Sequence, residues 1–239
     1  MTVVAIASVL DEAGIIHQTI THLLGQGVDQ VLVSEGHSSD ATRNILWNLA
    51  ADTNGRVVRL DQEGPFDQAQ EMTALARMAA EQGADWVIPF DADEFVCSPT
   101  GDIPADLAGV PAEVDRCYMP VWNHLTWTRR EREPRPMPKV LFRANPNVTL
   151  EWGQHDASGT GERQIGPLAI RELQYRDWDH FRAKIEKARR LYASYDFPES
   201  YGTHLRRLCA MDEGQLMAEW DRLRSFGAVD DPIPWKGWP

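Results

Sequence analysis

The sequence predicts an α/β protein with a mostly parallel central sheet, helices on both faces of that sheet and a helical C-terminal segment. In residues 1–96, short apolar segments rich in Val and Ile alternate with segments whose apolar residues recur at helical spacing. Short polar connections containing Gly or Asn separate these segments. Strands that alternate with helices in this way form βαβ units, and such units build a parallel sheet covered on both sides.

Strands are expected in this part of the chain at 3–10, 30–34, 56–60 and 86–90, and the first and last of them are apolar runs. The first helix opens at Asp11 and ends at two glycines, the second follows Asp40 as its N-cap, and the third spans 68–82. Right-handed crossovers place the carboxyl ends of parallel strands on one edge of the sheet. Acidic residues lie at or just after the four expected strand ends: Asp11, Glu35, Asp61 and Asp91.

The pattern changes after residue 96. Segment 98–111 is rich in Pro, Gly and Asp and predicts a surface loop, while segment 128–138 is dense in Arg, Glu and Pro and predicts a mobile loop over the site. Further strands are expected at 117–122, 139–143 and 169–173, the last two on either side of a Gly-rich loop at 153–161.

Two helices are expected near the C-terminus. One begins at Asp177 and carries an apolar stripe that ends at Tyr195, and the other begins at Asp212 with Gln215 as its capping partner. The tail at 230–239 is expected to be extended and to pack its tryptophans on the rest of the chain.

Composition limits the function classes. The chain has 239 residues and a net charge of −12, which argues against a general nucleic-acid binder. Its three cysteines are far apart, with no zinc-site or disulfide spacing, so a reducing compartment is expected. No apolar run reaches the ~18 residues that span a membrane, and no basic segment precedes the first apolar run. These features predict a cytoplasmic protein without a signal peptide.

The most informative motif is WVIPFDADEFV at 86–96, where a buried strand ends in Asp91, Asp93 and Glu94. Ligands of open α/β sheets bind just beyond the carboxyl ends of the strands. Mg²⁺ and Mn²⁺ prefer oxygen ligands, and a cation held by one or two carboxylates keeps positions for substrate phosphates. The motif therefore indicates chemistry on a phosphorylated donor such as a nucleotide, with a solvated loop or helix cap as the alternative.

The order of the motifs resembles a known family. Segment 9–46 resembles the opening of family 2-like glycosyltransferases with the GT-A fold, and segment 83–96 looks like their Asp-x-Asp strand in the version that continues Asp-Glu-Phe. KVLFR, GQHDA and YRDWDHFRAKIEKA, at 139–143, 153–157 and 175–188, resemble the later half of the same branch. The resemblance spans residues 3 to about 190.

The resemblance implies a GT-A-type, Rossmann-like sandwich and a metal-dependent hexosyl- or pentosyltransferase. Such an enzyme moves a sugar from a nucleoside-diphosphate sugar to an acceptor hydroxyl, with inversion if the displacement is direct. It implies that 1–96 forms the donor-binding half, 97–175 the acceptor half with the mobile loop, and 176–239 the C-terminal helices and tail of one continuous domain. The acceptor stays open between a glycan, a lipid-linked sugar, a small molecule, a protein and a nucleic-acid base, the last disfavoured by the net charge.

By the same resemblance, Mn²⁺ or Mg²⁺ is bound by Asp91 and Asp93, with His155 beside the metal and the diphosphate. The residues implied in donor binding are Leu10, Asp11, Glu12, Glu35, Asp61, Gln70 and Ala92. Four positions depart from the family pattern. Asp11 replaces Asn, Glu35 replaces Asp and Gln70 replaces Arg or Lys, while Glu172 replaces a frequent His and could instead pair with Arg171 or Arg176.

Direct displacement needs a base that accepts the proton of the acceptor hydroxyl. The candidates are Asp156, Glu94 and Glu172, and Asp156 is preferred because it adjoins His155. Three tryptophans fall in the acceptor half and are either sugar-stacking or core residues: Trp122, Trp127 and Trp152.

Two other protein classes remain open from the sequence. Phosphohydrolases of the haloacid dehalogenase type also carry Asp-x-Asp after a strand, but on the first strand, whereas three strand–helix units precede this motif. A non-catalytic sugar- or nucleotide-binding protein with a GT-A fold is the other alternative. Sugar-nucleotide pyrophosphorylases need a Gly-rich phosphate loop after the first strand, and VLDEAGI has none.

Overall fold

The computed structural model describes residues 1–62, 67–159, 161–194, 202–225 and 228–234. The chain divides into two compact units. The first unit comprises residues 1–122, 134–172 and 233–239, and the second comprises residues 123–133 and 173–232. The tryptophans of the C-terminal tail and Tyr195 lie outside the described residues, so their predicted packing stays a prediction.

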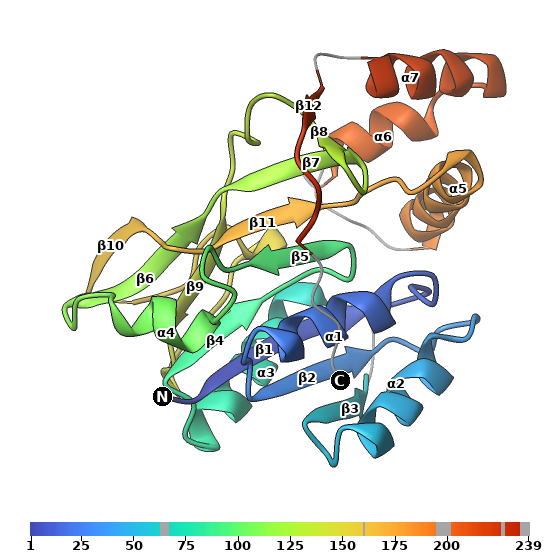
Figure 1. Ribbon diagram of the computed structural model, residues 1–239. Coiled ribbons are helices and arrows are strands. Elements are labelled where there is room, and N and C mark those ends of the chain that lie inside the picture. The colour runs from blue at the N-terminus through green and yellow to red at the C-terminus, as the bar shows by residue number, and fades with distance from the viewer. Residues whose placement is uncertain (63–66, 160, 195–201, 226–227, 235–239) are drawn as a thin grey trace. The chain divides into compact units, whose positions relative to one another are not determined.

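The first unit is built on a seven-stranded sheet with the order β10-β6-β9-β4-β1-β2-β3 (Figure 1). Its strands are β1 (Val3–Val9), β2 (Gln30–Glu35), β3 (Val57–Asp61), β4 (Trp86–Pro89), β6 (Val114–Met119), β9 (Lys139–Arg143) and β10 (Glu162–Ile165). The four N-terminal strands pair in parallel, while β9 runs antiparallel to both β4 and β6. The predicted mostly parallel α/β sheet is therefore confirmed.

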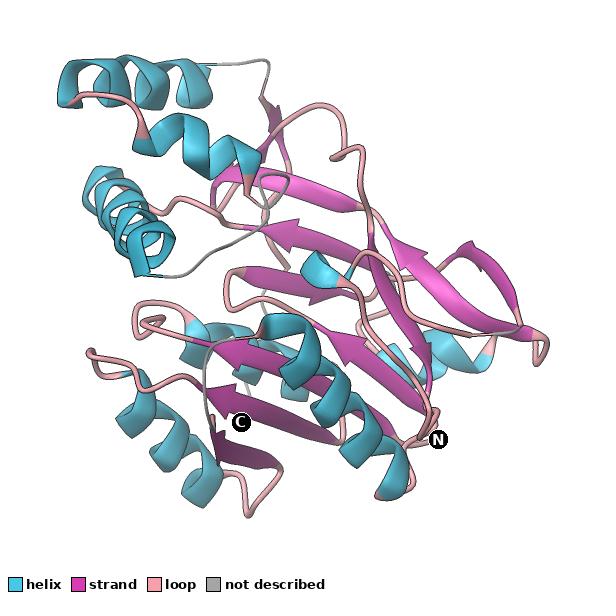
Figure 2. Ribbon diagram, turned by 180° about the vertical axis from the view of Figure 1, so that it is seen from behind, coloured by secondary structure: helices cyan, strands magenta, loops and turns pink. Residues whose placement is uncertain are grey.

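Helices cover both faces of this sheet, as predicted. They are α1 (Ile16–Gly25), α2 (Thr42–Asp52) and α3 (Gln68–Glu81), and α1 and α3 lie on opposite faces (Figures 1 and 2). The apolar side of α3, with Met72 and Leu75, packs on Ile6 and Val87. The N-cap of α2 is Ala41 rather than the predicted Asp40. Asp40 instead accepts a hydrogen bond from the backbone N of Thr42, at 2.9 Å.

The segment predicted as a surface loop at 98–111 contains a helix, α4 (Ile103–Ala108), so that prediction is wrong. Asp102 is its N-cap and accepts a hydrogen bond from the backbone N of Ala105, at 3.0 Å. Ile103 and Leu107 are fully buried. The Asp and Pro content that indicated a loop is therefore the chemistry of a helix start.

The middle of the chain holds more strands than predicted. The strand expected at 117–122 is divided at Pro120 into β6 and β7 (Val121–Thr126). The carboxylate motif continues directly into β5 (Glu94–Cys97), which pairs antiparallel with β11 (Ala169–Glu172). A short 3-10 helix, η1 (Trp152–Gln154), opens the Gly-rich loop, and β10 follows that loop.

The second unit contains three helices and a small antiparallel sheet. Its helices are α5 (Trp178–Ser194), α6 (Thr203–Cys209) and α7 (Glu213–Ser225), and β8 (Arg129–Arg130) pairs with β7 and with β12 (Val229–Asp230). Phe181, Ile185 and Trp220 belong to its core. Arg130 contacts Asp231 at 2.8 Å, and two residues of the segment 128–138 that was predicted to be a loop form the strand β8. The predicted mobility of this segment stays a prediction.

The predicted capping pair of the last helix is confirmed, since Asp212 and Gln215 exchange hydrogen bonds of 2.9 and 2.8 Å. α6 was not predicted. None of the helices in the described part of the chain is both long enough and apolar enough to cross a membrane.

Candidate active site

The Asp-x-Asp motif forms a tight turn at the carboxyl end of β4. The backbone N of Glu94 donates to the carbonyl O of Asp91 at 2.9 Å, and the backbone N of Asp91 donates to Glu94 Oε2 at 2.9 Å. The carbonyl O of Ala92 accepts a hydrogen bond from Thr19 Oγ1 of α1 at 2.5 Å. These bonds hold the turn at the sheet edge where the sequence places a ligand site.

Lys139 lies directly against this turn, although the sequence pattern did not identify it. It is the first residue of β9, and its side chain is only 4% exposed. Its Nζ lies 2.7 Å from Asp91 Oδ2 and 3.3 Å from Glu94 Oε1. The first aspartate of the motif is therefore already paired with a buried cation.

Glu172 and Arg135 extend this arrangement. Glu172 stands opposite Glu94 in the β5–β11 register, and Arg135 Nη1 donates a short hydrogen bond to Glu172 Oε2. The predicted pairings of Glu172 with Arg171 or Arg176 stay predictions. We call Asp91, Glu94, Glu172, Arg135 and Lys139 the charge cluster, since these three carboxylates and two cations act on one another electrostatically.

Burial shapes the protonation of the cluster. Burial raises the pKa of Glu94 to about 8, against the attraction of Lys139 and with the added repulsion of Asp91. Burial acts to lower the pKa of Lys139, but Asp91 and Glu94 outweigh it and raise that pKa above its usual range. Lys139 is thus a permanent cation at neutral pH, whereas Glu94 can gain or lose a proton there.

The Gly-rich loop brings a histidine and an amide to the cluster. Gly153 has φ +73°, and a Cβ at this position would lie 2.9 Å from both Cδ2 and Nε2 of His155, so the position requires glycine. Gln154 also adopts a left-handed backbone, with φ +59°. Its Nε2 lies 3.3 Å from Asp91 Oδ1, and its Oε1 is buried without a hydrogen-bond partner.

A hydrogen bond to the backbone fixes the tautomer of the neutral His155 ring. Its Nδ1 lies 2.8 Å from the carbonyl O of Pro138, which can only accept, so Nδ1 carries the proton and Nε2 keeps its lone pair. Burial lowers the pKa of His155, and the positive charges of Lys139 and Arg135 add to this effect despite the bond to Pro138.

These side chains fit a divalent cation that shares its coordination with a substrate. In the described residues, no group of three or more His, Cys, Asp and Glu side chains is placed to hold a metal ion by itself. The Asp91 carboxylate and the unpartnered Oε1 of Gln154 offer hard oxygen donors, and the Nε2 lone pair of His155 offers a softer nitrogen donor. Asp93 is buried in the same turn as Asp91. Mg²⁺ characteristically binds through one or two carboxylates together with substrate phosphates.

Asp156 faces a different set of partners. Its Oδ1 accepts from the backbone N of Ala157 at 2.8 Å and from Tyr118 Oη at 3.2 Å, and lies 3.6 Å from Arg116. Its Oδ2 lies 3.3 Å from Nη1 of Arg163, an exposed side chain. Among the described residues Oδ2 has only this contact, so the carboxylate can accept a proton there while its other hydrogen bonds stay in place.

The strand ends of β2 and β3 form a second polar group. The Glu35 side chain is fully buried. Its Oε1 accepts from the backbone N of Ser38 at 2.5 Å, and its Oε2 accepts from Arg43 Nε at 2.8 Å. Burial opposes ionisation of Glu35, but these bonds together hold its pKa below the usual range. Asp61 also contacts Arg43, at 3.4 Å, so the structure brings two of the predicted donor-site carboxylates together around this arginine.

The first loop is fastened to the same edge. Asp11 adopts φ +52°, and its Oδ1 accepts from the backbone N of Ser39 at 2.6 Å. The backbone N of Glu12 donates to Thr42 Oγ1 at 2.8 Å. The loop that carries Leu10, Asp11 and Glu12 is therefore held by the loop before α2.

Gln70 lies exposed in the first turn of α3, where its backbone N donates to the N-cap Asp67 at 3.0 Å. The next residue, Glu71, turns inward and accepts from Ser8 Oγ at 2.8 Å and Ser34 Oγ at 3.2 Å. One of its oxygens is buried without a partner. Glu71 was not predicted, although the two serines near the ends of β1 and β2 are a polar signal within apolar strands.

The expected sugar-stacking tryptophans differ in accessibility. Trp127 is 41% exposed and Trp122 is half-buried, while the side chain of Trp152 lies outside the described residues. Their stacking role stays a prediction.

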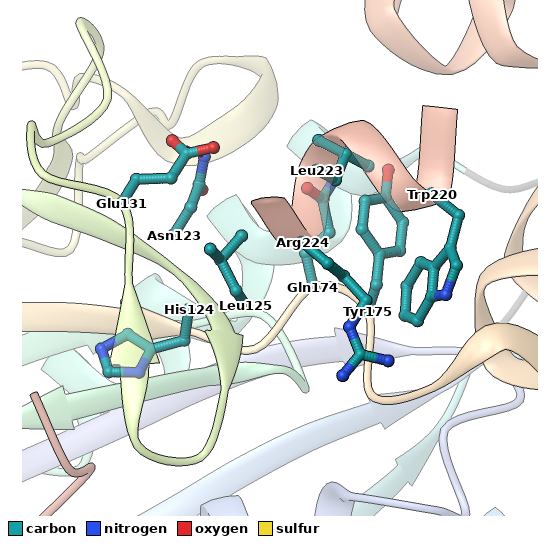
Figure 3. Close-up of a pocket in the computed structure, with 9 residues that line it drawn as sticks. All are labelled: Asn123, His124, Leu125, Glu131, Gln174, Tyr175, Trp220, Leu223 and Arg224. Atoms are coloured by element: carbon teal, nitrogen blue, oxygen red, sulfur yellow. Dashed lines mark hydrogen bonds between the residues drawn. The ribbon is translucent and has the colours of Figure 1, made fainter. Parts of the chain in front are cut away.

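The second unit has a cavity of its own, shown in Figure 3. It is lined by Asn123, His124, Leu125, Glu131, Gln174, Tyr175, Trp220, Leu223 and Arg224. Its volume is about 30 Å³, enough for one or two water molecules and too small for a sugar ring. This cavity is therefore not a substrate site as it stands.

The fold agrees with that of solved glycosyltransferase structures. A Pyrobaculum calidifontis mannosyltransferase, PcManGT, in complex with GDP-Man and Mn²⁺ matches with a TM-score of 0.51 and 13% identity, over 92% of this chain and 73% of that one. S. aureus TarS 1-349 in complex with UDP-GlcNAc matches with a TM-score of 0.53 and 15% identity, over 95% and 74%. A longer S. aureus TarS chain matches with a TM-score of 0.50 and 14% identity, and this chain spans only 44% of its length.

The protein therefore has the GT-A-type fold, as the resemblance implied. At these identities the likeness concerns the fold alone. No protein-family model matches the sequence, and no curated protein matches it.

Proposed function

We propose that the protein is a metal-dependent glycosyltransferase that moves a sugar from a nucleoside-diphosphate donor to an acceptor hydroxyl. The observation that carries this proposal is the Asp-x-Asp turn at the carboxyl edge of a GT-A-type sheet, with neutral His155 and the oxygen donors of Gln154 and Asp91 beside it. A structural loop would not need a buried, unpartnered amide oxygen next to a carboxylate.

Asp91 and Asp93 would hold the divalent cation, which supplies positive charge to the leaving diphosphate when it is bound. His155 keeps Nε2 free of a proton, so it can serve as a ligand or can accept a hydrogen bond in the donor complex. The group around Glu35, Arg43 and Asp61 is proposed to face the nucleoside. Both carboxylates are paired with arginines, Asp61 with Arg59 and Arg43, but Asp61 is 55% exposed and Glu35 is fully buried, so Asp61 is the better placed of the two to meet the ligand.

Solvent access ranks the candidate bases. The side chain of Asp156 is 28% exposed, compared with 8% for Glu172 and 1% for Glu94. A general base must reach the proton that it removes, so we propose Asp156 as the base. Glu94 and Glu172 then act by positioning Asp91, Lys139 and Arg135. A base lost from the site should slow transfer and leave donor binding intact.

The two alternatives receive less support. The Asp-x-Asp turn follows β4, not the first strand that a haloacid dehalogenase-type nucleophile would occupy. A purely binding role has no specific observation in its favour. The solved structures with GDP-Man and UDP-GlcNAc support a nucleoside-diphosphate hexose as the donor class.

The test is a panel of nucleoside-diphosphate sugars assayed with Mn²⁺, with Mg²⁺ and with EDTA. We expect thermal stabilisation by a nucleotide only with the metal, and slow donor hydrolysis in the absence of acceptor. Asp93→Asn should abolish this hydrolysis without a comparable loss of thermal stability. Full activity in EDTA would show that the metal assignment is wrong, and inactivity on every donor would count against a transferase.

A further inference from the structure

Lys139 is the most deeply buried cation of the charge cluster. Its side chain is 4% exposed, and a buried ammonium persists only where carboxylates compensate its charge. Asp91 and Glu94 provide this compensation at 2.7 and 3.3 Å. Lys139 therefore belongs to the same electrostatic unit as the proposed metal ligand.

The backbone fixes this arrangement. Lys139 opens β9, where it pairs with Met119 of β6, and two residues of β9 farther on pair with β4. Since β9 is held between two strands, its first side chain has a defined position at the end of β4. The ammonium is thus aimed at Asp91 by the sheet itself.

We propose that Lys139 competes with the divalent cation for the carboxylate of Asp91 and thereby sets how tightly the protein binds that cation. The inference rests on the proposed metal site at Asp91 and Asp93. It assigns to Lys139 a positioning role that acts through Asp91.

The geometry supports competition. A metal ion lies about 2.0–2.1 Å from a carboxylate oxygen in Mg²⁺ sites, and Nζ already lies 2.7 Å from Asp91 Oδ2. Two cations on one oxygen repel each other at short range in a poorly solvated site. The other oxygen, Asp91 Oδ1, has a weaker contact, with Gln154 Nε2 at 3.3 Å. A cation bound to Oδ1 would still be repelled by the Lys139 ammonium on Oδ2 of the same carboxylate.

Direct binding of Lys139 to the donor diphosphate is the other role that a lysine could have here. Its ammonium is almost fully enclosed, and two of its three N–H groups have carboxylates within 3.3 Å. The enclosure of the side chain leaves a phosphate little room to reach the third N–H. Competition is favoured instead, because the ammonium already contacts the carboxylate of Asp91 that the cation would use.

The experiment titrates Mn²⁺ into metal-free protein without nucleotide, with free Mn²⁺ measured by electron paramagnetic resonance. Lys139→Met should bind Mn²⁺ more tightly than wild type, by about tenfold or more, since a like charge at contact distance is removed. Lys187→Met is the matched control, because it removes the same charge from α5 in the second unit and should leave the affinity unchanged. Mn²⁺ should also raise the melting temperature of Lys139→Met more than that of wild type.

The outcomes separate the two proposals. If wild type binds Mn²⁺ at a site that Asp93→Asn removes, while Lys139→Met binds it no more tightly, competition is overturned and the metal site stands. If neither wild type nor Lys139→Met binds Mn²⁺, the metal site itself fails.

A second measurement uses wild type alone, in case Lys139→Met does not fold. Acetic anhydride labelling, read by peptide mass spectrometry, should label Lys139 more strongly once Mn²⁺ has taken Asp91, with Lys187 as the internal reference. Unchanged labelling of Lys139 at saturating Mn²⁺ would overturn competition.

Discussion

Gly153→Ala should damage the site through the position of His155. The backbone of Gly153 has φ +73°, which costs a residue with a Cβ about 1–2 kcal/mol. The new Cβ would also lie 2.9 Å from Nε2 and Cδ2 of His155, too close for the ring to stay in place. We expect the ring to move, to loosen its 2.8 Å bond to Pro138 and to weaken Mn²⁺ binding.

Gly83→Ala is the matched control for this change. Gly83 has φ +85°, so it carries the same backbone cost, but its Cβ would have no neighbour within 4 Å. Gly83→Ala should lose about 1–2 kcal/mol of unfolding free energy, which corresponds to a fall in melting temperature of several degrees, and Gly153→Ala should lose more because of its steric clash. Only Gly153→Ala should lose Mn²⁺ affinity and transferase activity.

The assay combines thermal unfolding with Mn²⁺ titration of both variants. The excess destabilisation of Gly153→Ala over Gly83→Ala measures the steric part, separate from the backbone part. The reasoning is refuted if Gly153→Ala binds Mn²⁺ as tightly as wild type while its melting temperature equals that of Gly83→Ala.

Two further predictions concern other parts of the chain. Asp156→Asn should keep donor binding and lower the rate of sugar transfer by about 10² or more, as measured with a responsive acceptor, and a wild-type rate would move the base to Glu172 or Glu94. Glu219 of α7 accepts hydrogen bonds from Arg222 and Arg207, and these contacts, against the opposing effect of burial, lower its pKa to about 2. Because the pKa of Glu219 is lower in the folded protein than the usual value of 4.5, its ionised form stabilises the fold at pH values above 4.5. This stabilisation is lost as the pH falls from 4.5 toward 2. The measurement is urea unfolding at several pH values. At pH 7, Glu219→Gln should be less stable than wild type by on the order of 2 kcal/mol, a figure that allows for the solvent exposure of the two arginines. Near pH 2 the difference in stability should vanish. A difference that is constant with pH would contradict the assigned contacts.

The first half of the fold was predictable because its signal is local. β1 and β4 are runs of mainly buried apolar residues, β2 and β3 keep shorter apolar cores, and α1 and α3 keep their apolar stripes, so the period of the sequence identifies each element. The same reasoning located Asp91 and Asp93 at a strand end. α4 was missed because an N-cap Asp and an early Pro resemble a turn until the burial of Ile103 and Leu107 is known.

The charge cluster was only partly predictable, because it depends on contacts between distant segments. Glu94 and Glu172 were both named, but their opposition follows from the β5–β11 register, which the local pattern does not determine. Lys139 looked like the polar start of an apolar strand, and only the antiparallel placement of β9 beside β4 brings it to Asp91. Asp156 was placed correctly beside His155 along the chain, yet its side chain contacts Tyr118 and Arg163 instead of the cluster residues.

The antiparallel strand β9 should tolerate insertions and deletions less well than the irregular segment that precedes it. Its first residue, Lys139, meets Asp91 at one edge of the sheet, and its last, Arg143, stacks on Trp86 and bonds to the carbonyl O of Val114 near the other edge. Side chains alternate between the two faces of the sheet along a strand. If one residue were added or removed between Lys139 and Arg143, one of these two side chains would therefore point to the opposite face. Homologous chains are therefore expected to vary in length in the irregular segment 131–138, while the five positions of β9 keep a constant spacing.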